Sequence, residues 1–211
     1  MGEPLADAIA AAVRDSGQTV PTGAIDKLAC YLRLLERWNR AYNLSAVRDA
    51  ATMVPRHVAD SLSIRPWLPE GALLDIGTGG GLPGLVIAIA EPERPVTLLD
   101  SGAKKARFLT QALIELDLPN AAVAQARAET WRPDAAFDVV VSRAFGSVRT
   151  FWDSARPFLA AGGQALAMKG RYPDCELATL PSDGLSYSVV RLEVAGQQGE
   201  RHLVRLARPT P

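Results

Sequence analysis

The chain has 211 residues, with 23 basic and 23 acidic side chains and a formal net charge of zero. This length suits one full α/β domain with a modest extension. A zero net charge excludes a protein that is basic over its whole surface, so any nucleic-acid footprint must be local. Hydrophobic residues make up 48% of the chain, enough for a proper core.

Membrane and metal signatures are absent from the sequence. There is no apolar signal segment at the N-terminus and no run of about eighteen apolar residues, which predicts a soluble cytoplasmic protein without a membrane partner. Cys30 and Cys175 lie far apart, and His57 and His202 are the only histidines. We therefore expect no disulfide framework and no metal site.

The first seventy residues predict a helical extension, with residues 71–211 forming the main domain. Apolar residues recur at spacings of three and four, which indicates an amphipathic helix beginning near Thr22: Ile25, Leu28, Leu32, Leu35 and Trp38. A second helix is expected over 50–65, because Pro66 disfavours its continuation. The first thirty residues match no specific pattern.

From residue 72 onward, strand-like and helix-like segments alternate. Strands are expected at 72–76, 95–100, 121–125, 137–142 and 163–168, with helices at about 83–91, 103–117 and 147–160. Such alternation predicts an α/β fold with a mostly parallel sheet. Two further strand-like runs, 185–194 and 202–207, read as an antiparallel hairpin at the sheet edge. A seven-stranded, mostly parallel sheet that ends in an antiparallel strand fits a Rossmann-like methyltransferase better than a standard dehydrogenase half.

The most informative segment is the apolar strand that runs into a glycine-rich turn, Leu73-Leu74-Asp75-Ile76-Gly77-Thr78-Gly79-Gly80-Gly81-Leu82-Pro83-Gly84. Pro83 can open the following helix, since the first helical position needs no backbone donor. Glycines let a ligand lie against bare backbone, and a helix N-terminus presents free N–H groups. This strand–turn–helix context predicts a site for a nucleotide-like cofactor.

Two cofactors compete for this loop. Gly79, Gly81 and Gly84 fit the G-x-G-x-x-G pattern of dinucleotide sites, which keeps an NAD-dependent dehydrogenase as an alternative. The pattern Asp75-x-Gly77-x-Gly79 instead places an acid just before the turn. A carboxylate there would repel a pyrophosphate but suits the cationic S-adenosylmethionine. We expect S-adenosylmethionine, with Asp75, Gly77 and Gly79 at its site.

An acid also ends the second strand. Asp100 stands where an open α/β sheet offers a carboxylate to ribose hydroxyls, a group that both cofactors share. The alternative is that Asp100 or Ser101 caps the next helix.

Two later segments end at the same sheet edge. Backbone groups of Ala128 and Glu129 can read an adenine edge, or Glu129 is an ordinary acid at a helix N-terminus. Arg143 directly follows a buried strand, where it can bind a carboxylate, a phosphate or a guanine edge. The alternative for Arg143 is an ion pair with Asp138 or Glu129.

Local positive charge suggests contacts with RNA. Lys169 follows the fifth strand, and Lys104, Lys105 and Arg107 fall in the first turns of a predicted helix, where cations oppose the macrodipole. Residues 33–65 hold six arginines interleaved with Trp38 and other aromatic side chains. Such a patch can bind RNA, although a solvated face and ordinary packing remain alternatives.

These segments together resemble the bacterial small-subunit (16S) ribosomal RNA guanine-N7 methyltransferase family, also called the glucose-inhibited division protein B family. The resemblance covers about Leu35 to Arg208. It rests on the glycine loop and on Trp38-Asn39-x-x-Tyr42-Asn43-Leu44-Ser45-Ala46, Arg56-His57-x-x-Asp60-Ser61-Leu62, Asp100-Ser101-x-x-Lys104-Lys105-x-x-Phe108-Leu109, Arg127-Ala128-Glu129, Ser142-Arg143-Ala144 and Met168-Lys169-Gly170. Many members carry Glu at the position of Asp100 and Lys at that of Arg208.

The resemblance implies S-adenosylmethionine-dependent methylation of guanine N7 in 16S rRNA. It implies cofactor contacts at Gly77, Leu82, Ala128, Glu129 and Arg143. We expect a monomer.

Because N7 has a free lone pair, no general base is expected. Arg143 would lie at the junction of cofactor and guanine, with Lys169, Asn43 and His57 lining the RNA side. A small-molecule methyltransferase and a non-catalytic RNA-binding assembly factor remain alternatives.

Overall fold

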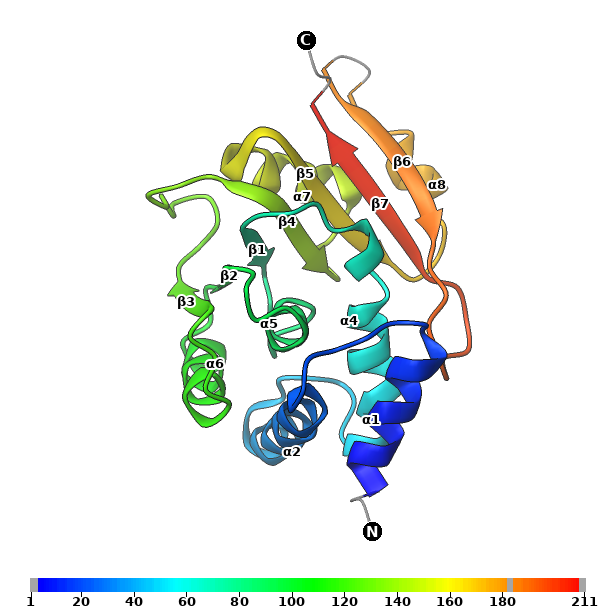
Figure 1. Ribbon diagram of the computed structural model, residues 1–211. Coiled ribbons are helices and arrows are strands. Elements are labelled where there is room, and N and C mark those ends of the chain that lie inside the picture. The colour runs from blue at the N-terminus through cyan, green and yellow to red at the C-terminus, as the bar shows by residue number, and fades with distance from the viewer. Residues whose placement is uncertain (1–3, 182–183, 209–211) are drawn as a thin grey trace.

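In the computed structural model, residues 4–181 and 184–208 are described, and they form a seven-stranded sheet in the order β3-β2-β1-β4-β5-β7-β6 (Figure 1). Strands β1 to β5 pair in parallel, and β7 pairs antiparallel with both β5 and β6. The sheet confirms the predicted fold class and the C-terminal hairpin. The strands are β1 (Leu73–Ile76), β2 (Val96–Asp100), β3 (Ala121–Gln125), β4 (Phe137–Arg143), β5 (Leu159–Lys169), β6 (Ser186–Arg191) and β7 (His202–Ala207).

Helices cover both faces of the sheet, because successive residues of the central strands point to opposite sides. Leu73, Val139 and Val141 join one apolar cluster with α5 (Gly84–Ala90) and α6 (Ala103–Glu115). Leu74 and Val140 join the other with α7 (Val148–Ala155) and α8 (Asp174–Leu177). Both faces of the central strands are buried, as expected for a parallel sheet.

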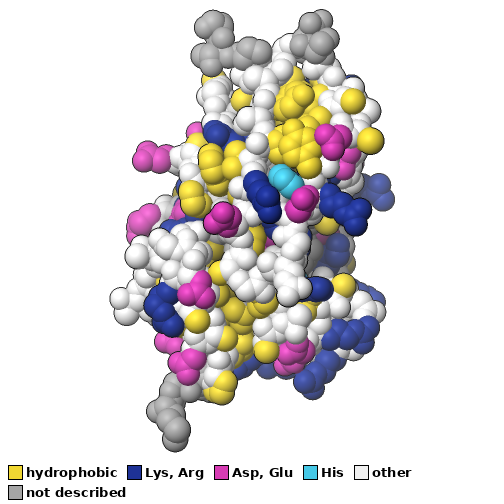
Figure 2. Space-filling view, turned by 90° about the vertical axis from the view of Figure 1, so that its right-hand side faces the viewer, with side chains coloured by type: hydrophobic (Ala, Val, Ile, Leu, Met, Phe, Trp, Pro, Cys, Tyr) yellow, Lys and Arg dark blue, Asp and Glu magenta, His cyan; other side chains and the backbone are white. Residues whose placement is uncertain are grey.

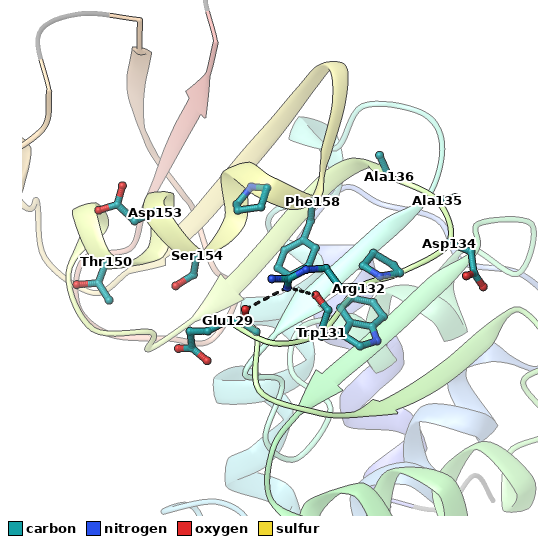
Figure 3. Close-up of a pocket in the computed structure, with 13 residues that line it drawn as sticks. Glu129, Trp131, Arg132, Asp134, Ala135, Ala136, Thr150, Asp153, Ser154 and Phe158 are labelled. Carbon is teal, nitrogen blue, oxygen red and sulfur yellow. Dashed lines mark hydrogen bonds between the residues drawn. The ribbon is translucent and has the colours of Figure 1, made fainter.

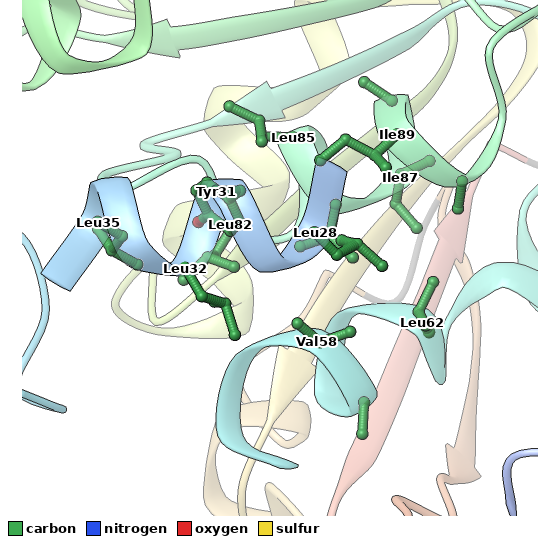
Figure 4. Packing of buried hydrophobic residues seen from close by; sticks show 14 of the residues in the cluster. Leu28, Tyr31, Leu32, Leu35, Val58, Leu62, Leu82, Leu85, Ile87 and Ile89 are labelled. Carbon is green, nitrogen blue, oxygen red and sulfur yellow. The ribbon is translucent and has the colours of Figure 1, made fainter. Parts of the chain in front are cut away.

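The N-terminal helices pack into the first of these clusters. They are α1 (Pro4–Asp15), α2 (Ala24–Tyr42), α3 (Ala50–Met53), the π-helix η1 (Val54–Ala59), α4 (Asp60–Leu62) and the 3₁₀-helix η2 (Arg65–Trp67). Leu28 and Leu32 of α2 belong to one cluster with Leu85 and Ile87 of α5, and Figure 4 shows Leu32 pointing toward Val58 of η1. The chain changes from helices to alternating strands near residue 70, yet one core spans that boundary.

Several element boundaries differ from the predictions. The helix expected over 147–160 ends at Ala155, and the 3₁₀-helix η3 (Arg156–Phe158) leads directly into β5. Pro157 explains the early end, because proline has no N–H with which to continue the helical hydrogen bonds. The helix expected over 50–65 is interrupted by η1. Pro83 lies at the cap position, and α5 begins one residue later.

The surface carries both signs of charge, as the zero net charge requires. Figure 2 shows one face on which basic and acidic side chains are interspersed among hydrophobic ones. Across residues 4–181 and 184–208, no helix is long and apolar enough to cross a membrane. The same residues contain no group of three histidine, cysteine or acidic side chains able to hold a metal ion.

Candidate active site

The glycine-rich loop joins β1 to α5 and is tied to the neighbouring strand. The N–H of Gly77 donates to the carbonyl of Leu99 in β2 at 2.8 Å. Gly77, Gly79 and Gly81 have φ angles of 68°, 60° and 93°, a region that glycine adopts without steric cost. The loop therefore presents backbone, with no side chain from these glycines, toward the carboxyl edge of the sheet.

Asp75 supports this loop from beneath and is fully buried. Its Oδ2 accepts hydrogen bonds from the Thr78 hydroxyl at 2.6 Å and the Gly84 N–H at 2.8 Å. Desolvation by burial raises the pKa of Asp75 to about 6, although these two hydrogen bonds act to lower it. Its Oδ1 has no hydrogen-bond partner within the described part of the chain. Asp75 thus braces the loop and retains one free acceptor.

Asp100 connects the end of β2 to the same loop. Its Oδ2 accepts from the Gly79 N–H at 3.0 Å and pairs with Lys105 Nζ at 3.2 Å, while Oδ1 accepts from the Gly102 N–H at 2.9 Å. The helix α6 is capped by Gly102 without a side-chain bond, so Asp100 is not its cap. Ser101 is exposed beside this carboxylate.

A buried tyrosine of α2 reaches the loop from the opposite direction. The Tyr31 hydroxyl donates to the carbonyl of Gly80 at 2.7 Å, and burial raises the pKa of this phenol. A Cβ on Gly80 would lie 3.1 Å from Leu35 of the same helix. Figure 4 shows Tyr31 beside Leu82. The N-terminal extension therefore fixes the loop's middle.

Asp60 joins two arginines from distant segments. Its side chain is buried, with Oδ2 3.1 Å from Arg143 Nη1 and Oδ1 3.0 Å from Arg201 Nε. Arg143 Nη1 also donates to the backbone carbonyl of Arg56 at 2.9 Å. Helix α4, the end of β4 and the start of β7 thus meet in one cluster, and Arg143 pairs with Asp60, not with Asp138 or Glu129.

His57 lies next to this cluster and is neutral. Desolvation by burial, followed by the Arg143 charge, lowers its pKa to about 4. Arg143 Nη1 lies 3.5 Å from Nδ1 and Ser45 Oγ lies 2.8 Å from Nε2. A guanidinium can only donate, so Nδ1 accepts and Nε2 carries the proton. Ser45 Oγ then accepts from His57 and from the Val47 N–H at 3.1 Å.

A cavity of about 610 Å³ brings the loop and the arginine cluster together. It includes six of the predicted site residues: His57, Gly77, Gly79, Leu82, Arg143 and Lys169. Its wall is completed mainly by Ser45, Arg56, Asp60, Thr78, Gly80, Met168, Gly170 and Arg201. Asp75 and Asp100 lie behind the loop and do not line the cavity.

Lys169 is held by its neighbours at the edge of this cavity. Its ammonium donates to the carbonyl of Gly146 at 2.7 Å and pairs with Glu176 at 2.7 Å. Glu176 also accepts from the N–H of Val148, the first residue of α7. Lys169 therefore fixes the β4–α7 connection, and its charge is shared with Glu176.

Asn43 lies outside the cavity lining. It is exposed and ends α2 in a left-handed conformation with φ 51°. The buried Asn39 organises the adjoining loop: its amide nitrogen donates to the carbonyls of Ser45 and Val47 at 2.8 and 2.9 Å, and its oxygen accepts from the Ser45 N–H at 2.8 Å. The loop 44–47 that faces the cavity thus depends on Asn39.

Ala128 and Glu129 lie in a second cavity of about 780 Å³, between the β3–β4 connection and α7 (Figure 3). Arg132 Nη1 donates there to the carbonyls of Glu129 and Trp131 at 3.0 and 2.7 Å. This cavity is larger than the first, but it contains neither the glycine loop nor the arginine cluster. We regard the smaller one as the reaction site because it joins both.

Sequence reasoning did not select Asp60, Arg201 or Tyr31 as site residues. Asp60 belongs to the Arg-His-x-x-Asp-Ser-Leu segment, so a signal for it was present. Arg201 follows a glycine-containing turn and Tyr31 lies on the apolar face of a helix, and neither has a local signal. Arg201 reaches the site through Asp60, 141 residues away in sequence, and Tyr31 reaches it through Gly80, 49 residues away.

Solved methyltransferase structures share this fold. A glycopeptide N-methyltransferase, MtfA, matches 72% of the chain and 94% of its own length with a TM-score of 0.58 and 15% identity. TrmN from Thermus thermophilus matches 82% of the chain and 53% of its own length with a TM-score of 0.55 and 18% identity. MtfA complexed with S-adenosyl-L-methionine gives a TM-score of 0.54 at 12% identity, covering 73% of the chain and 88% of its own. At these identities the likeness establishes the fold alone.

Sequence similarity is much closer. The family model described as rRNA small subunit methyltransferase G matches residues 24–204. Ribosomal RNA small subunit methyltransferase G of Alkalilimnicola ehrlichii is 49% identical over 208 residues, covering 99% of this chain and 94% of the relative. The Pseudomonas aeruginosa PAO1 protein of the same name is 47% identical over 204 residues, covering 96% and 95%. The chain therefore belongs to the rRNA small subunit methyltransferase G family.

Proposed function

We propose that the protein transfers a methyl group from S-adenosylmethionine to N7 of a guanine in 16S rRNA of the small ribosomal subunit. The observation that carries the proposal is the shared cavity, in which a glycine loop suited to the cofactor faces the His57–Arg143 cluster. Family membership supports the rRNA substrate, and such a substrate would place the protein in the cytoplasm.

The residues around the loop fit the cofactor. The backbone of Gly77, Gly79 and Leu82 borders the cavity, and the buried Oδ1 of Asp75 is an acceptor without a partner among the described residues. Asp100 and Ser101 stand at the β2 end, where an α/β sheet binds ribose. We assign these residues to the cofactor, with Ala128 and Glu129 beside its adenine. S-adenosylmethionine supplies a methyl group on a sulfonium centre.

The proposed reaction requires positioning more than proton transfer. Guanine N7 has an available lone pair, so the N7–carbon bond forms as the carbon–sulfur bond breaks. The electron pair of the broken bond stays on sulfur, and the positive charge passes to the guanine ring. No proton leaves N7, and neutral His57 therefore serves as a hydrogen-bonding group. Holding the two reactants in line is the main source of rate.

Arg143 is the residue we place at the junction of the two reactants. Its Nη1 is engaged by Asp60 and the Arg56 carbonyl, whereas Nε and Nη2 make no hydrogen bond to residues in the described ranges. A donor directed at guanine O6 leaves the N7 lone pair free, which a bidentate O6/N7 contact would not. Arg143 would also contact the cofactor.

Lys169, Asn43 and His57 would line the RNA side. Because the major groove of A-form RNA is too narrow to admit side chains, the target base must lie in a loop or be extruded.

A methyl-transfer assay tests the proposal. The protein is mixed with labelled S-adenosylmethionine and small ribosomal subunits from cells that lack a close relative, and the RNA is digested to nucleosides. Label in 7-methylguanosine is expected. Label in another nucleoside would retain the rRNA methyltransferase and overturn the N7 target. No label in RNA despite measured cofactor binding would favour a small-molecule methyltransferase.

A further inference from the structure

The C-terminal end of α2 carries an exposed tyrosine ring that is held from beneath. Tyr42 is 42% exposed, and its ring centroid lies 5.3 Å from that of Trp38. Trp38 packs edge-on against Phe108 of α6 at 5.7 Å, and Phe108 is fully buried. This stack anchors the Tyr42 ring to the core while leaving part of the ring accessible.

One cationic side chain lies over the exposed ring, and α2 carries two exposed arginines nearby in the sequence. Lys104 Nζ of α6 lies 5.6 Å from the Tyr42 centroid. The side chains of Arg37 and Arg40 are 65% and 78% exposed, and each forms a surface ion pair with a glutamate at 3.2 and 3.9 Å. Exposed ion pairs of this kind contribute little stability, so both guanidinium groups remain available to an anion.

A groove of about 390 Å³ continues along the seam between α2 and α6, with Trp38 and Arg107 in its lining. We refer to Tyr42, Trp38 and the cations at this seam as the α2–α6 surface; these cations are Arg37, Lys104 and Arg107, each of which contacts the other helix or lines the groove. The surface concentrates positive charge in a chain whose formal net charge is zero. Its composition matches sites that stack bases on aromatic rings beside phosphate-binding cations.

The α2–α6 surface adjoins the candidate active site along the chain. Leu44 lines the active-site cavity and follows Tyr42 by two residues, a span of at most about 7 Å. At about 3.4 Å per stacked nucleotide, that span corresponds to roughly two nucleotides. An RNA strand whose target guanine enters the cavity would therefore place the adjacent nucleotides over Tyr42.

We propose that the α2–α6 surface binds the single-stranded RNA that flanks the target guanine. One base stacks on Tyr42, and phosphates face Lys104 and the arginines. The inference rests on the proposed rRNA substrate and adds the surface that holds it. Neither Tyr42 nor Lys104 belongs to the proposed catalytic group, so a change in either acts on RNA binding and leaves the chemical step intact.

The first test measures the KM for small ribosomal subunits. Tyr42→Ala is expected to raise this KM about 5- to 150-fold, the range for loss of one base–aromatic stack, with kcat and the Kd for S-adenosylmethionine unchanged. Tyr42→Phe keeps the ring and is expected to retain wild-type kinetics. Lys104→Gln is expected to reduce the slope of log KM against log salt concentration by about 1, as for one lost phosphate contact.

Matched controls come from the opposite end of the sheet. Tyr187 on β6 is 50% exposed, and Arg191 on the same strand is also exposed. Tyr187→Ala and Arg191→Gln are expected to leave the KM and its salt dependence unchanged. An unchanged KM in Tyr42→Ala, or an equal rise in Tyr187→Ala, would overturn the proposal. A parallel loss of cofactor affinity in Tyr42→Ala would assign Tyr42 a structural role and would also overturn it.

A crosslinking experiment identifies the molecule that covers the surface. With p-benzoylphenylalanine placed at residue 42, irradiation on small subunits is expected to join the protein to 16S rRNA. A crosslink to a ribosomal protein would overturn the RNA assignment. If wild-type protein transfers no methyl group to RNA, the proposed function fails; if it methylates normally and the variants match it, only the α2–α6 surface fails.

Discussion

At the scale of single residues, Arg143 combines a structural and a proposed catalytic task. Its Nη1 holds the buried Asp60 carboxylate at 3.1 Å, while its other donors are left for a ligand. Asp60 also binds Arg201. The carboxylate that holds the guanidinium of Arg143 is therefore itself held in place by a second arginine. Such preorganisation is what a positioning mechanism requires.

Replacing Arg143 tests this assignment. Arg143→Ala is expected to lower kcat/KM by about 100-fold or more, as for loss of one preorganised donor, and to weaken S-adenosylmethionine binding measured by calorimetry. Arg149→Ala removes an exposed arginine of α7 that pairs with Asp153 at 2.7 Å and serves as the control. Unchanged kinetics in Arg143→Ala would remove this residue from the site.

Replacing His57 distinguishes a mechanism that uses a general base from one that does not. The proposed reaction releases no proton from N7, so His57→Asn is expected to reduce kcat by less than about tenfold, well below the roughly 100-fold or greater effect of a general base. Because the pKa of His57 is about 4, its charge does not change between pH 6 and 8, and the pH dependence of kcat in that range is expected to be the same in His57→Asn as in wild type. A variant without activity at every pH would contradict the mechanism.

At the scale of elements, α2 determines the shape of the glycine loop through one buried hydrogen bond. Tyr31→Phe leaves the Gly80 carbonyl without its donor at 2.7 Å, a loss of about 1–3 kcal/mol. The melting temperature is expected to fall by a few degrees, and the Kd for S-adenosylmethionine to rise severalfold.

Gln18→Ala provides a comparison for Tyr31→Phe. It removes a side-chain bond to the Leu62 carbonyl at 2.8 Å, which lies away from the loop. Gln18→Ala is expected to lower the melting temperature without changing cofactor affinity. Equal effects of both variants on affinity would indicate that Tyr31 contributes only general stability.

Elements with local signals were predicted well from the sequence. Strands β1 to β4 and the glycine loop follow from short apolar runs flanked on at least one side by glycine, proline or aspartate. The start of β5 was not predicted, because residues 159–163 include two glycines and no β-branched or aromatic residue. The π-helix η1 has no simple sequence signal, and it carries His57 into the cavity.

The arrangement of the site could be predicted only in part. Arg143 and the loop lie at strand ends, where any parallel sheet collects ligand-binding groups. The link from Asp60 to Arg201 spans 141 residues and requires the complete sheet, including β7. The ion pair of Lys169 with Glu176 at 2.7 Å could not be predicted, because Glu176 belongs to α8, a helix that the sequence pattern did not indicate.

At the scale of the whole molecule, two buried groups of the site impose opposite pH dependences on stability. The pKa of His57 falls from 6.5 to about 4 on folding, so below pH 6.5 only the unfolded state takes up this proton and stability is lost. The pKa of Asp75 rises from 3.8 to about 6, so below pH 6 the folded state takes up this proton first and stability is gained. Each contribution is at most about 3 kcal/mol.

Urea unfolding at pH 7, 5.5 and 4.5 separates the two contributions. The variant His57→Asn lacks the imidazole whose protonation in the unfolded state destabilises wild type below pH 6.5. Its free energy of unfolding relative to wild type is therefore expected to rise as the pH falls. The variant Asp75→Asn lacks the carboxyl group whose protonation in the folded state stabilises wild type below pH 6. Its free energy of unfolding relative to wild type is therefore expected to fall over the same range. Because the two effects offset each other in the wild type, the double variant is expected to follow the wild-type pH profile more closely than either single variant. Parallel profiles for all four proteins would show that neither group titrates differently in the folded state.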